Sequence, residues 1–405
     1  MAGSKPRGAV AAAHPLAVEA ATGVLRKGGD AVDAALAAAF TLGVAEPYYS
    51  GLGGGGFLLT HRAGGGSGGT GSQDLLDYHS RCPQGARPEM FRGKPEGEKD
   101  WGYRAAHVPG TARGLAEARE RYGRLPLAEL LSPAIAHAHG GVEVTPFFHA
   151  RASEPRFGEL CRSCPAFAAI YSDGGEPWPV GHRLVQAELG ASLERVAREG
   201  PGALYGGELS EPAEREFRSP GGLITREDLS RYEPRWVPPL RSTYRRWTIV
   251  TNRLPGCGPH LLQVLNLLEA HDLAALAPGS PEFISLLVAA FEVTFRERFA
   301  SWGDPECVRL DEEELVGKAR ASALAREMVP RRARRGRGRH SPARAEGSTT
   351  HLSVVDGRGN AVSLTQTLGS PFGSGVVVAG LGFCWNNHML WMEADPASPN
   401  APGPG

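Results

Sequence analysis

The chain has 405 residues, which allows two or three domains or one large one at roughly 100–200 residues per domain. Hydrophobic residues make up 41% of it and charged residues 22%, a globular composition that excludes wholesale disorder. Because 44 acidic side chains balance 44 basic ones, the chain has no excess of positive charge, and general binding of nucleic acid is not expected.

The first residues do not have the pattern of a secretion signal. Lys5 and Arg7 precede an apolar stretch that ends at His14, and this stretch is shorter than the roughly 7–15 residues that a signal peptide needs. No run approaches the ~18 apolar residues of a membrane span. We therefore expect a cytoplasmic protein without a membrane partner.

Helices and strands can be assigned from apolar periodicity and from capping residues. The spacing predicts a first helix over 15–27, ended by a pair of glycines. A second helix begins at the N-cap Asp30 and runs to about Val44. Strands are expected at 57–60 and 74–78, and helices at 111–122, at 127–138, from a capping box at 225–228, and at 281–301, the last one amphipathic.

Five glycines lie within 51–56, directly before the first expected strand. A phosphate-binding loop would need a helix after the glycines and a Gly-Lys-Ser/Thr signature, and this segment has neither. We expect instead that the glycines allow two backbones to approach closely.

Two further patterns have a plain interpretation. Cys161 and Cys164 form a lone C-x-x-C, but a zinc site needs more ligands at suitable spacing, so free thiols and no metal are expected. Residues 331–340 form a basic run. Like charges repel and no aromatic residues are interleaved for base stacking, so a solvated linker is favoured over a nucleic-acid-binding arm.

The most informative segment is a predicted hairpin close to the C-terminal end of the sequence. Two β-prone runs flank the turn at 356–360, and Thr349 and Thr367 are equally far from its centre, Arg358. In a symmetric antiparallel register the two threonines face each other, close enough for their hydroxyls to hydrogen-bond. By spacing alone such a pair is structural, because threonine favours strands.

The segment 349–363 resembles the start of the small subunit of γ-glutamyltransferases, a family of N-terminal-nucleophile hydrolases. The resemblance extends over nearly the whole chain. Its other motifs lie at 14–17, 28–35, 46–47, 51–57, 108–111, 122–126, 221–229 and 386–387. It implies an α+β fold, a four-layer αββα sandwich with two central antiparallel sheets, incomplete at the C-terminus of this chain.

The resemblance also implies self-cleavage between Ser348 and Thr349. The products would be a large-subunit region, 1–348, which ends in a basic linker at 331–348, and the start of a small subunit, 349–405. These would stay together as a heterodimer. A free α-amine has a pKa of ~7.7–8.0 and can act as general base on its own hydroxyl. Thr349 would then attack an amide, Thr367 would orient it, and water or an amine would resolve the acyl-enzyme without any cofactor. His351 is given no chemical role.

The substrate-binding positions depart from the family pattern. The arginine that grips the glutamyl carboxylate is His79 here, and Arg81, two residues further on, is the cation that could replace it. The family's Asn, Gln and Asp contacts align with Gly369, His388 and Trp391. We therefore expect a preference for acyl groups without a free amino acid end.

Several alternatives stay open at this point. Within the family, glutathione-like γ-glutamyl compounds compete with other small amides, such as those cleaved by acylases. A non-catalytic or unprocessed member is the alternative from another class. The family's small subunit is longer than residues 349–405, so we also expect the lid and oxyanion segments to lie beyond residue 405, and this chain to be a poor catalyst.

Overall fold

The computed structural model describes residues 8–64, 71–218, 221–305, 307–328 and 348–405. The chain divides into two compact units, the first with residues 1–237, 345–394 and 402–405 and the second with residues 238–344 and 395–401. The basic run at 331–340 lies outside the described residues. In the part of the chain that the structure describes, no helix combines the length and the apolar character needed to cross a membrane.

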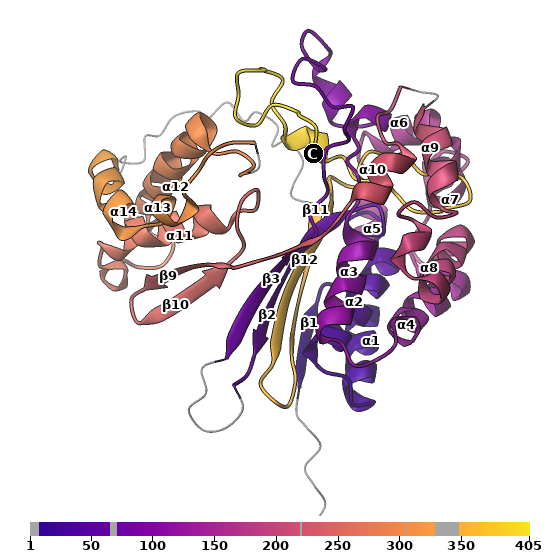
Figure 1. Ribbon diagram of the computed structural model, residues 1–405, viewed down its shortest axis with the longest axis horizontal. Coiled ribbons are helices and arrows are strands. Elements are labelled where there is room, and N and C mark those ends of the chain that lie inside the picture. The colour runs from indigo at the N-terminus through magenta and orange to yellow at the C-terminus, as the bar shows by residue number, and fades with distance from the viewer. Residues whose placement is uncertain (1–7, 65–70, 219–220, 306, 329–347) are drawn as a thin grey trace, which may run out of the picture. The chain divides into compact units, whose positions relative to one another are not determined.

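The first unit is built on a six-stranded sheet in which every pair of neighbours is antiparallel. Its order is β1 (Ala9–Ala12), β11 (Ser348–Val355), β12 (Ala361–Gly369), β2 (Gly55–Arg62), β3 (Ser72–Asp77) and β8 (Arg235–Val237). The expected hairpin therefore forms the centre of the sheet, between strands from the N-terminal part of the chain (Figure 1). The α+β class is confirmed, and the described residues form one of the two central sheets that the resemblance implied.

Helices lie on one side of this sheet, some against the strands and others packed on those helices (Figure 1). They are α1 (Pro15–Arg26), α2 (Ala31–Ala45), α3 (Thr111–Tyr122), α4 (Leu127–Gly140), α5 (Pro146–Ala152), α6 (Phe157–Ser163), α7 (Pro165–Tyr171), α8 (Ala187–Glu199), α9 (Ser210–Arg218) and α10 (Arg226–Arg231). Short 3₁₀ turns lie at Glu96–Lys99, Tyr103–Ala105, Pro201–Ala203 and His388–Trp391, and small strand pairs join β4 (Val142–Glu143) to β7 (Arg183–Leu184) and β5 (Ser172–Asp173) to β6 (Glu176–Pro177).

Alternation along the hairpin separates a buried face from an exposed one. In β11 every second side chain is buried, and the buried set includes Leu352 and Val354. These side chains and Leu364 of β12 belong to the same core cluster as helix α2, all 15 residues of which are buried. Thr349 and His351 alternate with these buried residues along β11, and both are exposed. The strand thus places its first threonine away from the helical core.

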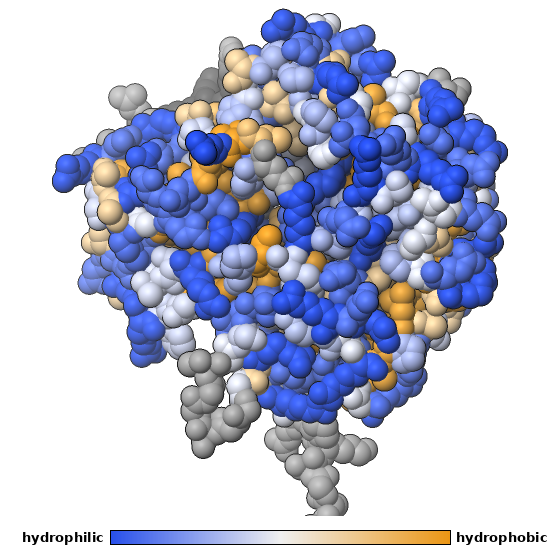
Figure 2. Space-filling view, viewed as in Figure 1, coloured by the Kyte–Doolittle hydropathy of each residue, from blue (hydrophilic) through white to orange (hydrophobic). Residues whose placement is uncertain are grey.

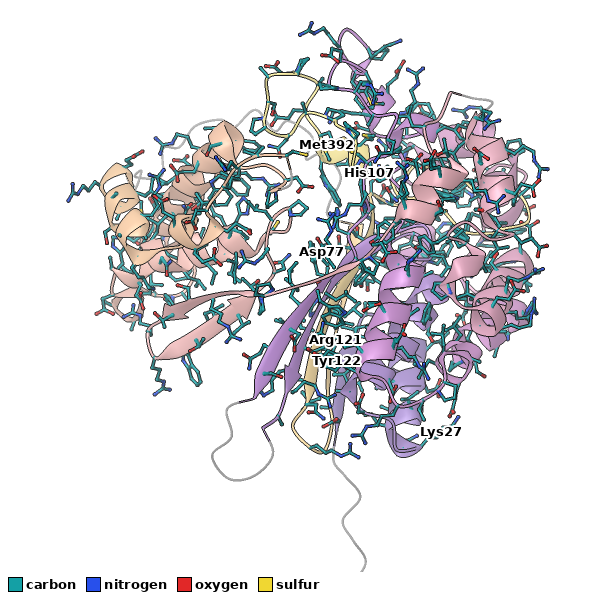
Figure 3. The ribbon with its side chains drawn as sticks, viewed as in Figure 1. Lys27, Asp77, His107, Arg121, Tyr122 and Met392 are labelled. Carbon is teal, nitrogen blue, oxygen red and sulfur yellow. The ribbon has the colours of Figure 1, made fainter. Side chains whose placement is uncertain are left out.

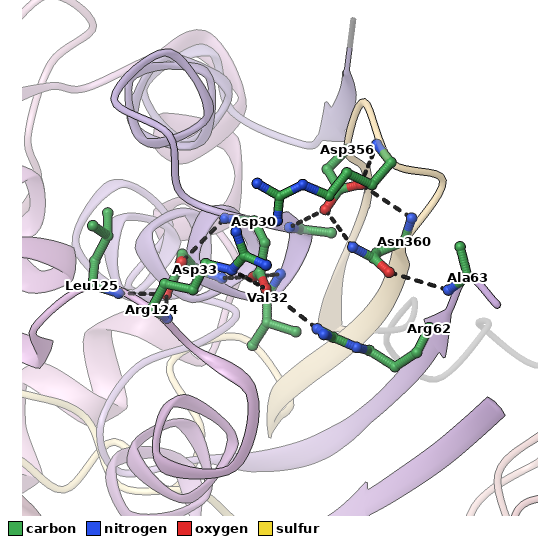
Figure 4. Close-up of polar contacts among 11 residues, drawn as sticks. Asp30, Val32, Asp33, Arg62, Ala63, Arg124, Leu125, Asp356 and Asn360 are labelled. Atoms are coloured by element: carbon green, nitrogen blue, oxygen red, sulfur yellow. Dashed lines mark hydrogen bonds and ion pairs between the residues drawn. The ribbon is translucent and has the colours of Figure 1, made fainter. Parts of the chain in front are cut away.

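A network of carboxylates fixes the start of α2 (Figure 4). Asp30 accepts hydrogen bonds from the backbone N–H groups of Val32 and Asp33 at 2.9 and 3.2 Å, and Asp33 accepts one from Asp30 N in return. Asp30 also pairs with Arg62 at 3.3 Å and with Arg124 at 3.6 Å. The predicted N-cap is confirmed, and it is a full capping box.

The second unit contains β9 (Leu240–Tyr244), β10 (Trp247–Thr251), α11 (Gly258–Glu269), α12 (Pro281–Ser301), α13 (Glu312–Leu315) and α14 (Lys318–Leu324), with 3₁₀ turns at Leu273–Ala275 and Ala325–Glu327. Its core includes Leu267, Leu286, Val293 and Leu324. Helix α12 has the predicted bounds but is not amphipathic, because a second apolar face, which includes Val288, Phe291 and Phe295, is exposed.

The visible surface of the molecule is mostly hydrophilic, with scattered hydrophobic patches (Figure 2).

Candidate active site

The hairpin brings Thr349 and Thr367 face to face. They are directly paired in the β11–β12 register, and Thr349 Oγ1 donates a hydrogen bond to Thr367 Oγ1 at 3.1 Å. One step further the register shifts, so that Ser348 pairs with Gly369, while Leu368 N donates to the carbonyl of Tyr49. The symmetric register predicted from the turn is confirmed, with a bulge at its end.

The hydroxyl of Thr367 links the two sides of the Ser348–Thr349 peptide bond. It donates to the carbonyl oxygen of Ser348 at 2.6 Å and accepts from Gly369 N at 2.9 Å. A donor on this carbonyl polarises it, and the Thr349 hydroxyl lies on the other side of the same bond. Thr367 and Ser348 are buried, whereas Thr349 is exposed.

The glycines of 51–56 explain how β12 can lie so close to its neighbour β2. A Cβ at Gly54 would be 2.4 Å from the Thr367 carbonyl oxygen, and a Cβ at Gly56 would be 2.0 Å from that of Thr365. Both distances are too short for any side chain. The predicted close approach of backbones is confirmed, and it supports the strand that carries Thr367.

A side-chain hydrogen bond joins the start of β11 to the residue that follows α2. Thr350 Oγ1 donates to Glu46 Oε2 at 2.9 Å, and both side chains are buried. Burial raises the pKa of Glu46, and the hydrogen bond from Thr350 opposes this effect only in part. Sequence reasoning gave Glu46 no part in the site, although it belongs to a quoted motif.

A cavity of about 1000 Å³ opens beside Thr349 along β11. Tyr48 and Tyr49 pack edge to face at 4.7 Å and form one part of its wall. Its lining also includes Thr349, His351, Phe147 and Arg183. His351 bonds Thr365 across the strands at 2.8 Å.

Three of the predicted substrate-binding residues form a stack of rings. His388 stacks on Trp391 at 4.4 Å and on His79 at 4.9 Å between ring centroids, and Phe57 extends the stack beyond His79 at 5.6 Å. His388 is fully buried and Trp391 is 42% exposed. Burial, together with the neighbouring His79 and His107, lowers the pKa of His388.

Gly369 joins this stack to the threonine pair. Its N–H bonds Thr367, and a Cβ built on it would lie 3.1 Å from Cδ2 of His388. A side chain such as asparagine does not fit here, because the same Cβ would be 2.3 Å from Asn387 Oδ1 and Gly369 has a φ of +103°. The structure therefore places Gly369, His388, Trp391 and His79 together, next to the nucleophile candidate.

Arg81 does not offer a free cation to this cluster. Strand β3 ends at Asp77, and the Arg81 guanidinium pairs with the Asp77 carboxylate at 3.3 Å. The side chain of Arg81 is only 13% exposed. Asp77 and His107 lie at the same end of the sheet (Figure 3). An arginine that is already paired with a carboxylate is not available to grip a substrate carboxylate by a two-point salt bridge.

Sequence reasoning missed three residues that contact this cluster. Ser80 bonds both His107 and His388, and Cys82 bonds His107. His107 directly precedes the 108–111 motif, and this was the signal in the sequence that could have pointed to it.

Cys161 and Cys164 have free thiols, and among the described residues no three His, Cys, Asp or Glu side chains are placed to hold a metal ion.

Comparison with known proteins finds relatives along nearly the whole chain. The gamma-glutamyltranspeptidase family matches residues 17–405. The chain is 36% identical over 413 residues to the acylase ACY 1 proenzyme of Pseudomonas sp. (strain SE83), covering 99% of this chain and 72% of that protein. It is 33% identical over 408 residues to the glutathione hydrolase proenzyme of Escherichia coli (strain K12), covering 98% of this chain and 69% of that protein.

Solved structures share the fold over a similar range. The cephalosporin acylase from Bacillus halodurans matches with a TM-score of 0.85 at 27% identity, covering 98% of this chain and 72% of that one. The gamma-glutamyltranspeptidase of Helicobacter pylori matches with a TM-score of 0.76 at 30% identity, covering 85% of this chain and 100% of that one. The fold is therefore that of N-terminal-nucleophile acylases and transpeptidases.

Proposed function

This chain belongs to the gamma-glutamyltranspeptidase family, and we propose that it is a proenzyme that cleaves itself before Thr349 and then hydrolyses small amides whose acyl group lacks a free amino acid end. The observation that carries the first part is the hydrogen-bonded line from Thr349 through Thr367 to the Ser348 carbonyl. The observation that carries the second is the uncharged ring stack beside it.

In self-cleavage the Thr349 hydroxyl oxygen attacks the carbonyl carbon of Ser348. The C–N bond to Thr349 breaks, its nitrogen takes up a proton, and the Ser348 acyl group is held as an ester on Thr349 Oγ1. Water then hydrolyses this ester and leaves Thr349 with a free α-amine. Thr367 supports the step by donating to the carbonyl oxygen, where negative charge develops.

In turnover the new α-amine accepts the proton of the Thr349 hydroxyl, which attacks the substrate amide. The amine product leaves, and water resolves the acyl-enzyme. The amine is suited to this task because its pKa of ~7.7–8.0 lies near neutral pH. Thr367 holds the hydroxyl in position by the hydrogen bond that it accepts in the uncleaved chain.

The acyl preference rests on what surrounds Gly369. The neighbouring side chains are His388, whose pKa is lowered by burial, and the rings stacked on it. The nearby Arg81 is paired with Asp77. A glutamyl head carries both a carboxylate and an ammonium, and their burial without charged partners is costly. The relative named as an acylase and the cephalosporin acylase structure support the same choice.

The processing step is tested with Thr349→Ala. We expect the unchanged protein to yield two fragments, with Thr349 as the new N-terminus by Edman sequencing, and the variant to stay a single chain without amidase activity. Thr350→Ala is a matched control, because its hydroxyl bonds Glu46 and not Thr367. Cleavage of the Thr349→Ala variant, or an unprocessed wild-type chain, would contradict the proposal.

The acyl preference is tested by comparing a γ-glutamyl anilide with a simple acyl anilide of equal length. Each charge-assisted hydrogen bond is worth ~1.5–3 kcal/mol, so the loss of two should favour the simple acyl group by about 10²-fold in kcat/KM. Selective turnover of the glutamyl substrate would instead show a glutathione hydrolase type of specificity, like that of the relative so named.

A further inference from the structure

The cavity beside the nucleophile candidate is present because β1 is shorter than β11. Strand β1 pairs with β11 only over residues 352–355. The chain then turns away into α1, whose N-cap His14 accepts a hydrogen bond from Leu16 N at 3.2 Å. Among the described residues, no strand lies next to 349–351 on this side, and all three residues line the cavity. We call these three residues the open edge of β11.

The open edge of β11 exposes backbone groups that can pair with an extended chain. In an antiparallel sheet, successive residues direct their N–H and C=O groups to alternate edges. At least one residue of the open edge therefore directs both groups toward the cavity. An unpaired edge of this kind binds a peptide by adding it to the sheet as a strand. Three residues of a strand span ~10 Å, which is room for two or three residues of a ligand.

Three aromatic side chains form a wall of the same cavity: Tyr48, Tyr49 and Phe147. Phe147 packs on Tyr48 and on Tyr49, with 5.8 and 5.9 Å between ring centroids. Tyr48 is buried and packs in turn on Phe148 of the core at 5.2 Å, whereas Phe147 is 51% exposed. This aromatic wall is thus fixed from behind and open in front. A large exposed ring on a packed base is suited to bind an apolar side chain.

The charged side chains of the lining do not select a ligand of either sign. Arg183 and Glu143 have opposite charges and face each other in the β4–β7 register. Burial lowers the pKa of His14 and of His137, so both are mainly neutral at neutral pH. Glu46 is buried, and burial raises the pKa of its carboxyl. We therefore expect recognition through backbone hydrogen bonds and apolar contacts rather than through an ion pair.

The cavity and the ring stack lie on opposite sides of Thr349. Gly369 is on the side of β12, while the cavity is on the side where β1 ends. The acyl and amine parts of an amide extend in opposite directions from the carbonyl carbon that the nucleophile attacks. An acyl group held next to Gly369 therefore directs the amine part of the substrate into the cavity.

We propose that the cavity binds the amine part of the amide substrate and that this part is a peptide. The peptide backbone pairs with the open edge of β11 as an added strand, and its first side chain, aromatic or large and apolar, packs on the aromatic wall. The volume of about 1000 Å³ is at the upper end for pockets that bind such ligands. The inference rests on the proposed amide hydrolase. When Thr349 Oγ1 forms the ester with the acyl carbon, the C–N bond breaks, and the peptide takes up a proton on its nitrogen and leaves as a free amine.

The first experiment measures binding of the amine product without turnover. The probe is 4-fluorophenylalanyl-alanine amide, titrated into the protein and followed by ¹⁹F NMR. We expect saturable binding to the wild type and a Kd about five- to tenfold higher for Phe147→Ala, the value of one aromatic contact. Phe299→Ala is the matched control, because it removes an exposed ring of the second unit, and its Kd should equal that of the wild type. Phe147 is half exposed, so its loss should leave the core folded.

The second experiment varies the amine part while the acyl group stays the same. The substrates carry phenylalanyl-alanine amide, alanyl-alanine amide, or the phenylalanyl compound with an ester in place of the amide between its two residues. The ester removes the N–H and weakens the carbonyl of that linkage, so it tests whichever of them faces β11. In kcat/KM the wild type should prefer the phenylalanyl over the alanyl peptide about tenfold and the amide over the ester about three- to tenfold. Phe147→Ala should lose the first preference, and Phe299→Ala should keep it.

The outcomes separate this inference from the proposed function. Probe binding that is absent, or that Phe147→Ala leaves unchanged, would overturn the aromatic wall as a binding site, and equal rates for the amide and the ester would overturn pairing with the open edge. No turnover of any of the three substrates, or turnover that survives Thr349→Ala, would overturn the proposed amide hydrolase. The ¹⁹F titration would still test the cavity in that case, because it needs no chemistry by Thr349.

Discussion

Single hydroxyl groups decide the chemistry of this chain at the scale of the residue. The hydroxyl of Thr367 donates to the Ser348 carbonyl and accepts from Thr349, so one side chain contacts both the attacking oxygen and the carbonyl under attack. Beside it, Gly369 has no side chain and leaves room for the buried ring of His388. Both features depend on donors and acceptors of particular atoms, and each can be tested by a single substitution.

Thr367→Val should slow self-cleavage by about 10²–10³-fold, because it removes the donor at the developing oxyanion. The rate is measured from the fraction of cleaved chain on denaturing gels over time. Thr365→Val is the matched control: it lies on the same strand, but its hydroxyl bonds His351. Equal effects of the two variants would show that β12 stability, rather than the donor, limits cleavage.

The buried histidines should make stability depend on pH. The folded pKa of His107 is about 3, against 6.5 in an unfolded chain, so its contribution is present above pH 6.5 and is lost as the pH falls toward 3. From pH 7.5 to 5.0, His107 alone should lower the free energy of unfolding by about 2 kcal/mol. Urea titrations of wild type and His107→Gln should differ by this amount in their pH dependence.

The difference between the two proteins isolates His107. Burial raises the pKa of Glu46, so the Glu46 contribution has the opposite sign and is lost as the pH rises through its folded pKa. Glu46 is present in both proteins and cancels in the comparison. Identical pH dependence of the two proteins would mean that the pKa of His107 is the same in the folded and the unfolded chain.

At the scale of the element, local polar contacts determine where a helix begins and ends. They do not determine which face of the helix is buried. The bounds of α12, which begins after the N-cap Ser280, agree with the sequence prediction, and the capping box at 225–228 is present with Asp228 in the third position. Periodicity could not tell which apolar face of α12 is buried, because this helix has apolar residues on more than one face. Which face of α12 stays exposed depends on where the other elements of the second unit pack against it.

Asp30→Ala should lower the free energy of unfolding by about 1–3 kcal/mol, measured by urea titration. The substitution removes two cap hydrogen bonds and the partner of Arg62 and Arg124. Asp30→Asn keeps an acceptor for the cap but loses the negative charge, so its loss should be smaller. If both variants lose the same amount, the two arginines rather than the cap hold the start of α2.

At the scale of the molecule, the first unit depends on strands from both ends of the sequence. Strands β11 and β12 lie between β1 and β2, so the segment after Thr349 is an internal part of the sheet. Its side chains Leu352, Val354, Val362 and Leu364 are buried in the same core cluster as α2. The subunit boundary proposed at Ser348–Thr349 therefore crosses a single hydrophobic core.

The two products of cleavage should stay together under native conditions. Each fully buried aliphatic side chain contributes about 1.5–3 kcal/mol, and the strand hydrogen bonds on both sides of the hairpin add to this. Gel filtration should give one peak that separates into two bands on a denaturing gel, whereas Thr349→Ala gives one band. Separate elution of the fragments would contradict a heterodimer.

The sequence by itself determined those features that act over a few residues. A symmetric turn set the register that pairs Thr349 with Thr367, and Asp30 marked the start of α2. Only the tertiary structure decided that Arg81 pairs with Asp77 and that Cys82, Ser80 and His107 connect to His388. Caps and turns are formed by neighbours in the chain, so their patterns are visible in sequence. Contacts between distant segments depend on how the whole core excludes water, and no local pattern records that.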